Sequence, residues 1–239
     1  MKAQGGKAIY GASVGILMLD ATFPRIPGDM GNATTWPFPV HYKIVRGASP
    51  DLVVRQGASG LLPLFIDAAK ELVADGVDGI TTNCGFLSLI QAELQAAVPV
   101  PVATSSLMQV RMVNAVLPPS KRAGILTINA SSLSEAHLSA AEVPRGTPIG
   151  TTEGGAEFTR AILGNEPELD VAAARSDNVA AAKRLLSDNP DLGAIVLECT
   201  NMVPYAADIR TVTGLPVFSI ESFVTWFQSG LSPRRFPDP

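Results

Sequence analysis

The sequence contains two cysteines, Cys84 and Cys199, and they occupy equivalent places in two similar stretches of chain, residues 76–106 and 191–221. In each stretch an apolar run precedes the cysteine, and a helical segment and a Pro-Val step follow it. Cys84 lies 17 positions before Pro101, and Cys199 lies 17 positions before Pro216. Because the two placements match, we interpret the cysteines as opposed thiols of one active site.

Two thiols at the start of two helical segments are suited to acid/base chemistry on carbon. The free N–H groups and partial positive charge of a helix N-terminus favour thiolate, and can bring a cysteine pKa down from about 8.5 toward neutrality. One thiolate would remove a carbon-bound proton and the other thiol would deliver one to the opposite face, with nearby donors stabilising the enolate-like transition state. The alternative is that each cysteine is a small buried hydrophobe, as free cysteines often are.

The rest of the chain alternates between strand and helix patterns, which is typical of parallel sheets with right-handed crossovers. The pattern predicts strands over 8–19, 40–45, 77–82, 100–103, 123–129, 148–151, 194–198 and 216–219, and helices over 57–74, 88–97, 105–116, 131–141, 153–163, 168–187, 204–211 and 220–228. The tripeptide Gly-Ile-Leu at 15–17 returns at 124–126, where the pattern restarts. We therefore predict an α/β protein of two pseudo-symmetric lobes, each a mostly parallel sheet flanked by helices, with the active site between them.

The boundary between the lobes is predicted near residues 117–122. Residues 1–117 then form the lobe with Cys84, and residues 118–239 form the lobe with Cys199. The last segment, 232–239, is too rich in proline to continue a helix, and we expect the C-terminal tail to cross back to the first lobe. Residues 20–39 form a long loop rich in Pro, Gly and Asn. Such a loop in a compact domain is usually functional, and whether it is a lid stays open.

Composition excludes several functions. The net charge is -4 with 17% charged residues, so there is no basic field to attract nucleic acid or an anionic membrane. The apolar run at 8–19 ends at Asp20 and is too short to span a bilayer, so we expect a cytoplasmic protein with reduced cysteines. His41 and His137 lack metal-ligand spacing, and no glycine pattern matches a nucleotide site. No metal or cofactor is expected.

The motifs around the cysteines resemble those of the aspartate/glutamate/hydantoin racemase superfamily. Residues 198–201, Glu-Cys-Thr-Asn, resemble its second cysteine motif, and residues 82–86, Thr-Asn-Cys-Gly-Phe, stand where the family keeps its first. The resemblance covers nearly the whole chain. It implies a cofactor-independent enzyme of two pseudo-symmetric lobes whose cysteines act as paired acid and base.

The chain departs from the amino-acid racemases after the first cysteine. Those enzymes have Asn-Thr there to hold the substrate carboxylate, whereas this sequence has Gly85 and Phe86. The change implies a roomier and more apolar pocket. The loop around Arg25 is more similar to poorly characterised relatives and to the algal dimethylsulfoniopropionate lyases of the superfamily, in which the same proton abstraction ends in elimination.

Polar residues beside the predicted strand ends are the candidate substrate-binding groups. Each has a structural alternative: the Asn, Thr and Ser residues cap helices well, Asp20 can cap a loop, and Arg25 either binds a carboxylate bidentately or is solvated. The resemblance favours substrate contact for Thr200 and Asn201. The predicted set is Asp20, Arg25, Asn83, Gly85, Thr127, Asn129, Ser131, Thr200 and Asn201.

Glu198 has two interpretations. It either tunes the neighbouring Cys199 thiol or shuttles its proton, or it plays an outward structural role. Adjacent side chains in a strand point to opposite faces, and this favours the structural role.

The function predicted from these residues is a cofactor-independent racemase or epimerase, an isomerase that exchanges a proton beside the carboxylate of an amino acid or related small acid through Cys84 and Cys199. A lyase or decarboxylase on the same scaffold, such as a dimethylsulfoniopropionate-lyase-like enzyme, is the alternative. A carboxylate-binding module without turnover is a third. We also expect a homodimer or higher homo-oligomer, for which Phe223 and Trp226 are candidate contacts.

Overall fold

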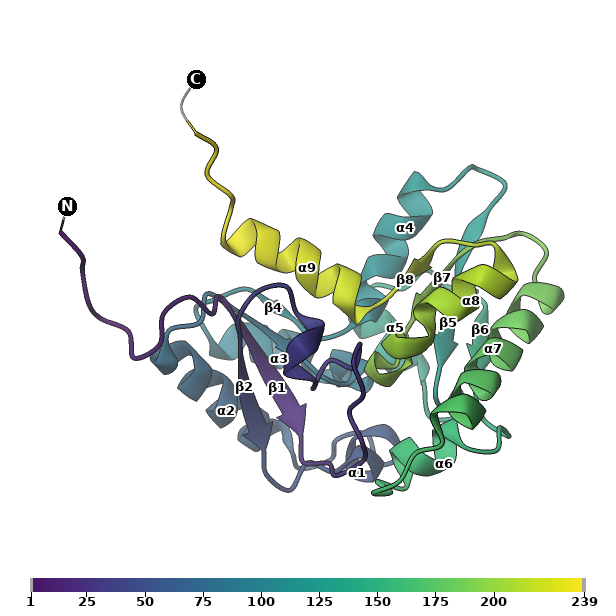
Figure 1. The fold of residues 1–239 in the computed structure, drawn as a ribbon, viewed down its shortest axis with the longest axis horizontal. Coiled ribbons are helices and arrows are strands. Elements are labelled where there is room, and N and C mark those ends of the chain that lie inside the picture. Colours follow the sequence, from purple (N-terminus) through teal and green to yellow (C-terminus); the bar gives the residue numbers. More distant parts are fainter. Residues whose placement is uncertain (1, 238–239) are drawn as a thin grey trace.

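The computed structural model describes residues 2–237 and contains two four-stranded parallel sheets. Strand order is β2-β1-β3-β4 in the first sheet and β6-β5-β7-β8 in the second, so both have the same topology (Figure 1). Helices flank both sheets. The predicted fold class, an α/β protein with two similar helix-flanked parallel sheets, is confirmed.

The first half of the chain builds the first sheet and its helices. Its elements are β1 (Val14–Leu19), the 3-10 helix η1 (Ala33–Thr35), β2 (Val40–Val45), α1 (Pro50–Val54), α2 (Leu62–Asp75), β3 (Gly79–Thr82), the 3-10 helix η2 (Gly85–Ile90), α3 (Gln91–Ala97), β4 (Val102–Ala103), the 3-10 helix η3 (Ser106–Gln109) and α4 (Val110–Val116).

The second half repeats the arrangement. Its elements are β5 (Arg122–Thr127), α5 (Glu135–Ala140), β6 (Ile149–Thr151), α6 (Phe158–Leu163), α7 (Val171–Asp188), β7 (Leu192–Leu197), the 3-10 helix η4 (Thr200–Tyr205), α8 (Ala206–Thr213), β8 (Val217–Phe218) and α9 (Ile220–Leu231).

The sequence repeat around the cysteines is also a structural repeat. An offset of 115 residues carries the end of β3 onto the end of β7, the whole of η2 onto η4, and β4 onto β8. Each cysteine therefore stands two residues beyond the end of an inner strand and directly before a 3-10 helix. Since ligands of open parallel sheets bind beyond the carboxyl ends of the strands, both cysteines have the expected position.

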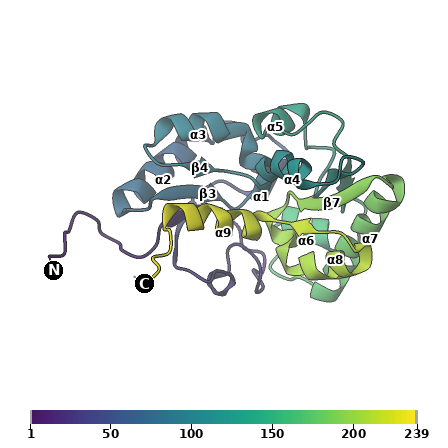
Figure 2. The same cartoon turned by 90° about the horizontal axis from the view of Figure 1, so that it is seen from above.

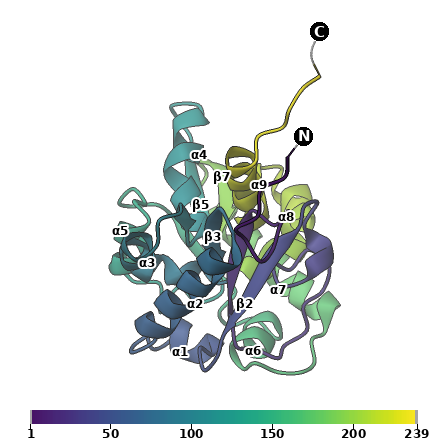
Figure 3. The same ribbon diagram turned by 90° about the vertical axis from the view of Figure 1, so that its left-hand side faces the viewer.

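Side chains of strand β1 point alternately to the two faces of the first sheet and so belong to two different hydrophobic cores. Leu17 and Leu19 belong to the large core that includes α2, whereas Ile16 and Met18 belong to a second core that includes α9. Gly15 faces α2, where a β-carbon would come within 2.9 Å of Leu72. Helix α2 covers one face of the sheet (Figure 3), and the period-two pattern of β1 serves both faces.

Helix α9 joins the second half of the chain to the first sheet. It follows β8 of the second sheet but lies alongside β3 of the first (Figure 2). Phe223 and Val224 on α9 are buried against the β1 side chains of the second core. The division into lobes at residue 117 stays a prediction. The predicted tail, 232–239, ends in residues 238–239, which lie outside the described residues.

Most predicted elements are present, with shifted ends. The first strand begins at Val14 rather than residue 8, and the helix predicted from residue 57 begins at Leu62 because Gly57 and Gly60 adopt positive φ angles. The segments after both cysteines begin as 3-10 helices. The short helix α1 was not predicted; Ser49 caps it and Pro50 starts it, which is a common N-terminal pattern.

The two aromatic residues suggested for a homodimer differ in burial. Phe223 is 3% exposed and belongs to the core under α9, so it is not a surface contact. Trp226 is 57% exposed and stacks on the Phe223 ring at a centroid distance of 5.6 Å. The homo-oligomer stays a prediction. Within residues 2–237, no helix combines the length and apolar character needed to cross a membrane.

Replacing Phe223 with alanine is expected to lower the free energy of unfolding by about 3 kcal/mol, because it removes a buried aromatic ring between α9 and β1. Urea denaturation measures the effect. The matched control is Phe236→Ala, since Phe236 is 77% exposed and its loss is expected to change stability by less than about 0.5 kcal/mol. Equal effects of the two substitutions would contradict the packing of α9 described above.

Candidate active site between the two sheets

One cavity lies at the carboxyl ends of the strands and is lined from both halves of the chain. Cys84, Gly85 and Phe86 line it from the first half, and Glu198 and Cys199 from the second. Its other lining residues are Leu19, Phe23, Pro50, Val54, Asn83, Ile128, Ile162, Leu163, Thr200 and Asn201. The cavity volume is about 20 Å³, room for about one water molecule. The two thiols thus face one narrow and largely apolar space.

Both thiols are held in the protonated form. Burial, and next the charge of Glu198, raise the pKa of Cys84 to about 12. The same two causes raise the pKa of Cys199 well above its usual range. Backbone N–H groups at the helix starts oppose these effects, from Phe86 and Leu87 at Cys84. The expectation that helix N-termini bring the thiol pKa down toward neutrality is therefore wrong for this state, because desolvation outweighs the N–H groups.

Glu198 is fully buried, and its carboxylate is only half satisfied. The Thr127 hydroxyl donates to Oε2 at 2.6 Å, but Oε1 has no hydrogen-bond partner. Burial raises the pKa of Glu198 to about 7. Its side chain lines the cavity beside Cys199, so the predicted outward structural role is wrong. The prediction assumed that the side chains of Glu198 and Cys199 alternate as in a strand and that one face is exposed. Strand β7 ends at Leu197, and both faces of a helix-covered parallel sheet are buried.

Gly85 provides the room that the Glu198 carboxylate occupies. A β-carbon at position 85 would lie 2.2 Å from Oε1 and 2.4 Å from the backbone oxygen of Glu198. No side chain fits there unless Glu198 and its backbone move. Position 85 must therefore be glycine as long as the buried Glu198 carboxylate, which follows the end of β7, occupies this space.

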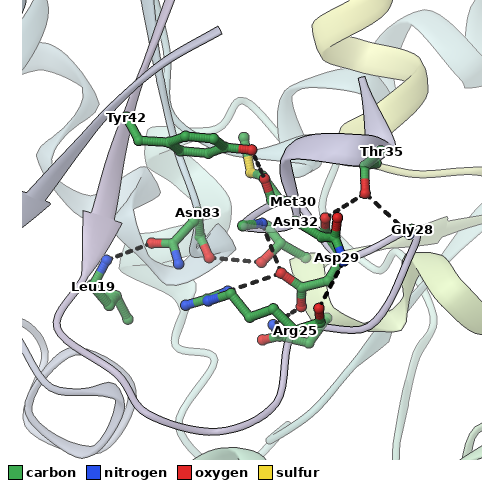
Figure 4. Close-up of polar contacts among 12 residues, drawn as sticks. Leu19, Arg25, Gly28, Asp29, Met30, Asn32, Thr35, Tyr42 and Asn83 are labelled. Carbon is green, nitrogen blue, oxygen red and sulfur yellow. Dashed lines mark hydrogen bonds and ion pairs between the residues drawn. The ribbon is translucent and has the colours of Figure 1, made fainter. Parts of the chain in front are cut away.

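The loop between β1 and β2 crosses to the second half of the chain and supports the cavity from one side. Asp29 is buried and accepts hydrogen bonds from Arg25 Nη1 at 2.9 Å and from Asn201 Nδ2 at 2.6 Å. Asn201 Oδ1 in turn accepts from the Cys199 thiol at 3.6 Å. Figure 4 shows Arg25 extending from this loop toward Asn83. Sequence reasoning missed Asp29, whose role depends on a partner 172 residues away.

Asn83 and Thr200 tie the two halves together. Asn83 Oδ1 accepts from the backbone N–H of Leu19 at 2.7 Å (Figure 4). The Thr200 hydroxyl donates to the backbone oxygen of Asn83 at 2.6 Å. Both residues line the cavity. In this state the Thr200 hydroxyl and the Asn83 side-chain oxygen are committed to the protein itself, so their predicted contact with substrate stays a prediction.

Five predicted residues do not line the cavity. Arg25 pairs with Asp29, and the Thr127 hydroxyl donates to Glu198, which is a lining residue. The other three make local contacts. Asp20 pairs with Arg46 at 3.0 Å near the surface. The Asn129 side chain accepts from the backbone N–H of Ser132 and closes a turn. Ser131 is exposed, and its backbone N–H donates to Glu153. These contacts are the local capping alternatives for such residue types.

The two histidines lie apart from the cavity lining. His41 pairs with Asp75 at 3.2 Å, and His137 is buried with its ring edge-on to Phe86 at a centroid distance of 5.1 Å. Burial lowers the pKa of His137 to about 4, so the ring is neutral. Within the described part of the chain, no three His, Cys, Asp or Glu side chains cluster as metal ligands would.

Comparison with known proteins places the chain in a family. No family model matches it. It is 31% identical to the dimethylsulfoniopropionate lyase of Durusdinium sp. clade D over 93% of this chain and 77% of that protein. It is 30% identical to dimethylsulfoniopropionate lyase 7 of Emiliania huxleyi (strain CCMP1516), over 93% of this chain and 68% of that protein. The chain belongs to the dimethylsulfoniopropionate lyase family.

Solved structures share the fold of this lyase-family chain. It superposes on a mutant of arylmalonate decarboxylase in a sulfate-associated form with a TM-score of 0.63 and 16% identity, covering 95% of this chain and 96% of that one. Allantoin racemase from Klebsiella pneumoniae gives a TM-score of 0.66 and 16% identity, covering 92% and 87%. The expected membership of the aspartate/glutamate/hydantoin racemase superfamily, and hence of a group of enzymes, is confirmed.

The leading functional expectation is wrong. A racemase or epimerase is not what the curated relatives are: those that match over about nine tenths of the chain are dimethylsulfoniopropionate lyases. Racemases match by fold alone, at 15–16% identity. The alternative, a lyase on the same scaffold, is the better supported one. The shared fold misled because two opposed thiols serve proton removal whether it ends in exchange or in elimination.

The raised pKa of Glu198 predicts a pH-dependent loss of stability. Below pH 4.5 the carboxyl is protonated in both the folded and unfolded chain; between pH 4.5 and 7 the unfolded chain releases the proton first, so stability falls as pH rises. The full loss is about 3 kcal/mol. Urea denaturation of wild type and Glu198→Gln from pH 4 to 8 measures it: their stability difference is expected to fall and then level above pH 7. A difference that does not change with pH would contradict the buried, unpaired carboxyl.

Gly85→Ala is expected to lower the unfolding free energy by about 1–3 kcal/mol, because the new methyl group strikes backbone as well as side-chain atoms of Glu198. The matched control is Gly230→Ala in α9, where a β-carbon meets nothing within 4 Å. That substitution is expected to leave stability unchanged or raise it by up to about 1 kcal/mol. Chemical denaturation of both variants decides, and an unaffected Gly85→Ala protein would show that the Glu198 carboxylate does not occupy this space.

Proposed function

We propose that this protein is a lyase that breaks the carbon–sulfur bond of dimethylsulfoniopropionate, or of a closely related β-sulfonium carboxylate, by β-elimination. The observation that carries the proposal is the family relation over 93% of the chain, at 31% identity, to a dimethylsulfoniopropionate lyase. The cavity supports it, since it presents two thiols to one small space.

The elimination requires one base, and the cationic sulfur departs as part of a neutral molecule. A cysteine thiolate removes a proton from the carbon beside the carboxylate. The electron pair of that C–H bond becomes the carbon–carbon double bond, and the bond from the next carbon to the sulfonium sulfur breaks. Dimethyl sulfide leaves with the sulfur electron pair, and acrylate remains. The cysteine that has taken this proton is again the protonated thiol of the resting enzyme; the proton that balances the reaction is the one the thiol releases to water when it ionises.

The high thiol pKa values suit this order of events. In the closed state burial and Glu198 disfavour thiolate at Cys84 and Cys199. A cationic sulfonium group entering the same cavity acts in the opposite direction, because a nearby positive charge favours the ionised form of a thiol. The base would then form when the substrate is present. A nearly closed cavity also keeps water from the reacting carbon.

The cavity must widen to admit the substrate. A volume of about 20 Å³ is smaller than a substrate of eight non-hydrogen atoms requires. The loop between β1 and β2 is the element we expect to move, because Phe23 lines the cavity and the loop reaches the second half of the chain through the Asp29–Asn201 hydrogen bond. In this proposal the loop admits the substrate and then reforms that contact.

Cys84→Ser and Cys199→Ser test the proposed base. Serine keeps the size of the side chain but is a far weaker acid, so both variants are expected to lose activity and at least one to lose about 100-fold or more in kcat. Release of dimethyl sulfide and acrylate from dimethylsulfoniopropionate is the measurement, with Ser176→Ala on the exposed face of α7 as the control. Retention of kcat within about tenfold of wild type by both cysteine variants would contradict a cysteine base.

A further inference from the structure

Two charged side chains near the cavity, the buried Glu198 and the partly buried Arg25, each have one buried polar atom without a partner, and the two charges are opposite. On Glu198 it is the carboxylate oxygen Oε1, and on Arg25 it is the guanidinium nitrogen Nη2. Buried polar atoms in native proteins nearly always have hydrogen-bond partners. An unpaired cationic donor and an unpaired anionic acceptor beside one cavity are therefore best explained by a ligand that supplies both missing partners.

Glu198 provides the negative end. Its Oε1 atom is buried against Gly85, in the space that a side chain at that position would fill, and it has no hydrogen-bond partner. Around it the cavity wall is apolar: Phe86, Ile128 and Ile162 are lining residues. A sulfonium group carries no N–H, so it cannot be recognised by hydrogen-bond acceptors in the usual way. A carboxylate for its charge, with aromatic and aliphatic side chains for its methyl groups, matches its chemistry.

Arg25 provides the positive end. One side of its guanidinium is used, since Nη1 donates to Asp29 at 2.9 Å and the group lies over the Phe23 ring at 4.6 Å. Phe23 is itself a lining residue, and the Arg25 charge reaches the Cys84 thiol, where it weakly opposes the rise in pKa that burial and Glu198 cause. Figure 4 shows the guanidinium directed toward Asn83, another lining residue. Arg25 itself does not line the cavity in this state, so a substrate carboxylate would meet the Nη2 donor when the loop that carries Arg25 moves to admit the substrate.

We propose that Glu198 and Arg25 are the two ends of one zwitterion-binding site, with Glu198 facing the cationic group of the substrate and Arg25 its carboxylate. The inference rests on the proposed function for the identity of the zwitterion. It goes further by assigning each charge of the substrate to a residue. It also explains Gly85, because any larger residue would displace the carboxylate from the cavity.

The pairing of individual atoms favours a ligand with both signs, whereas the net charge does not decide: Asp29, Arg25 and an ionised Glu198 sum to one negative charge, which a net-neutral zwitterion leaves unchanged. Arg25 is already neutralised by Asp29, and the thiols are uncharged, so an ionised Glu198 is left without a counter-charge in the cavity. A simple carboxylate ligand would add a second negative charge beside Glu198. A simple cation would leave Arg25 Nη2 unpaired. A zwitterion brings a positive group to Glu198 and a carboxylate to Arg25, so neither side chain is left with an unpaired atom.

Binding of three ligands of nearly equal shape tests the assignment without turnover. The first is 3-(trimethylammonio)propionate, which carries both charges. The second, 4,4-dimethylpentanoate, replaces the cationic nitrogen with carbon, and the third, 3-(trimethylammonio)propanamide, replaces the carboxylate with a neutral amide. Dissociation constants are measured by titration calorimetry for wild type, Glu198→Gln and Arg25→Gln. Glu71→Gln and Arg46→Gln, at exposed or partly exposed surface ion pairs, are the controls.

The expected result is a double dissociation. Wild type and both controls bind the zwitterion at least about tenfold more tightly than either neutralised ligand, as loss of a charge-assisted contact implies. Glu198→Gln loses the preference for ammonium over carbon but keeps the preference for carboxylate over amide. Arg25→Gln shows the reverse. General damage to the fold would lower all affinities together and could not produce this pattern.

The outcomes separate this inference from the proposed lyase activity. Wild-type protein that binds the three ligands equally, or binds none of them, would overturn the zwitterion site, as would a Glu198→Gln variant with an undiminished preference for the cation. If the double dissociation is found but dimethylsulfoniopropionate is not cleaved, the site stands and the proposed function fails. If cleavage is found without the dissociation, the function stands and the assignment of the two residues fails.

Discussion

Burial of three proton-bearing groups in one small cavity is the constraint on which the chemistry of this protein depends. The Cys84 and Cys199 thiols and the Glu198 carboxyl share a space of about 20 Å³, and burial raises the pKa of all three. No positive charge within the cavity offsets them in this closed state. A cationic ligand in the cavity would lower the pKa of these groups. The electrostatics of the cavity therefore suit a sulfonium compound.

The protein maintains this arrangement by linking its two halves at several points around the cavity. Thr200 on η4 bonds the backbone of Asn83 after β3, Ser106 at η3 donates to the backbone oxygen of Leu197 at the end of β7, and Asn201 bonds Asp29 in the long loop. Helix α9 then packs the end of the chain on the first sheet. Such contacts hold the strand ends in register, so the two thiols reach the same space.

The long loop after β1 has two functions in this arrangement. Its Asp29 and Arg25 form part of the polar network beside Cys199, and its Phe23 forms part of the apolar wall. If this loop moves as proposed, closure of the cavity and completion of the site occur together. This is a common use of long loops beside rigid sheets.

Periodicity and the cysteine repeat were sufficient to predict the two parallel sheets, and an offset of 115 residues carries η2 onto η4 in the structure as it does in the sequence. Element ends were less predictable, because positive φ angles at Gly57 and Gly60 and the 3-10 turns after both cysteines are set locally by packing. Of the candidate polar residues, Asp20, Asn129 and Ser131 satisfy local contacts instead, which no pattern of residue types distinguishes from substrate binding.

By itself the sequence determined the fold and the place of the two cysteines at strand ends, because these depend on residue spacing and apolar periodicity; the superfamily followed from the resemblance of the two cysteine motifs. Only the tertiary structure decided that Glu198 points into the cavity, that Gly85 makes room for it and that Asp29 supports Asn201 and Arg25. Each of those depends on a contact between segments far apart in the chain. The ionisation of the thiols was likewise decided by tertiary structure, since desolvation is a property of the assembled cavity and not of the residues before and after a cysteine.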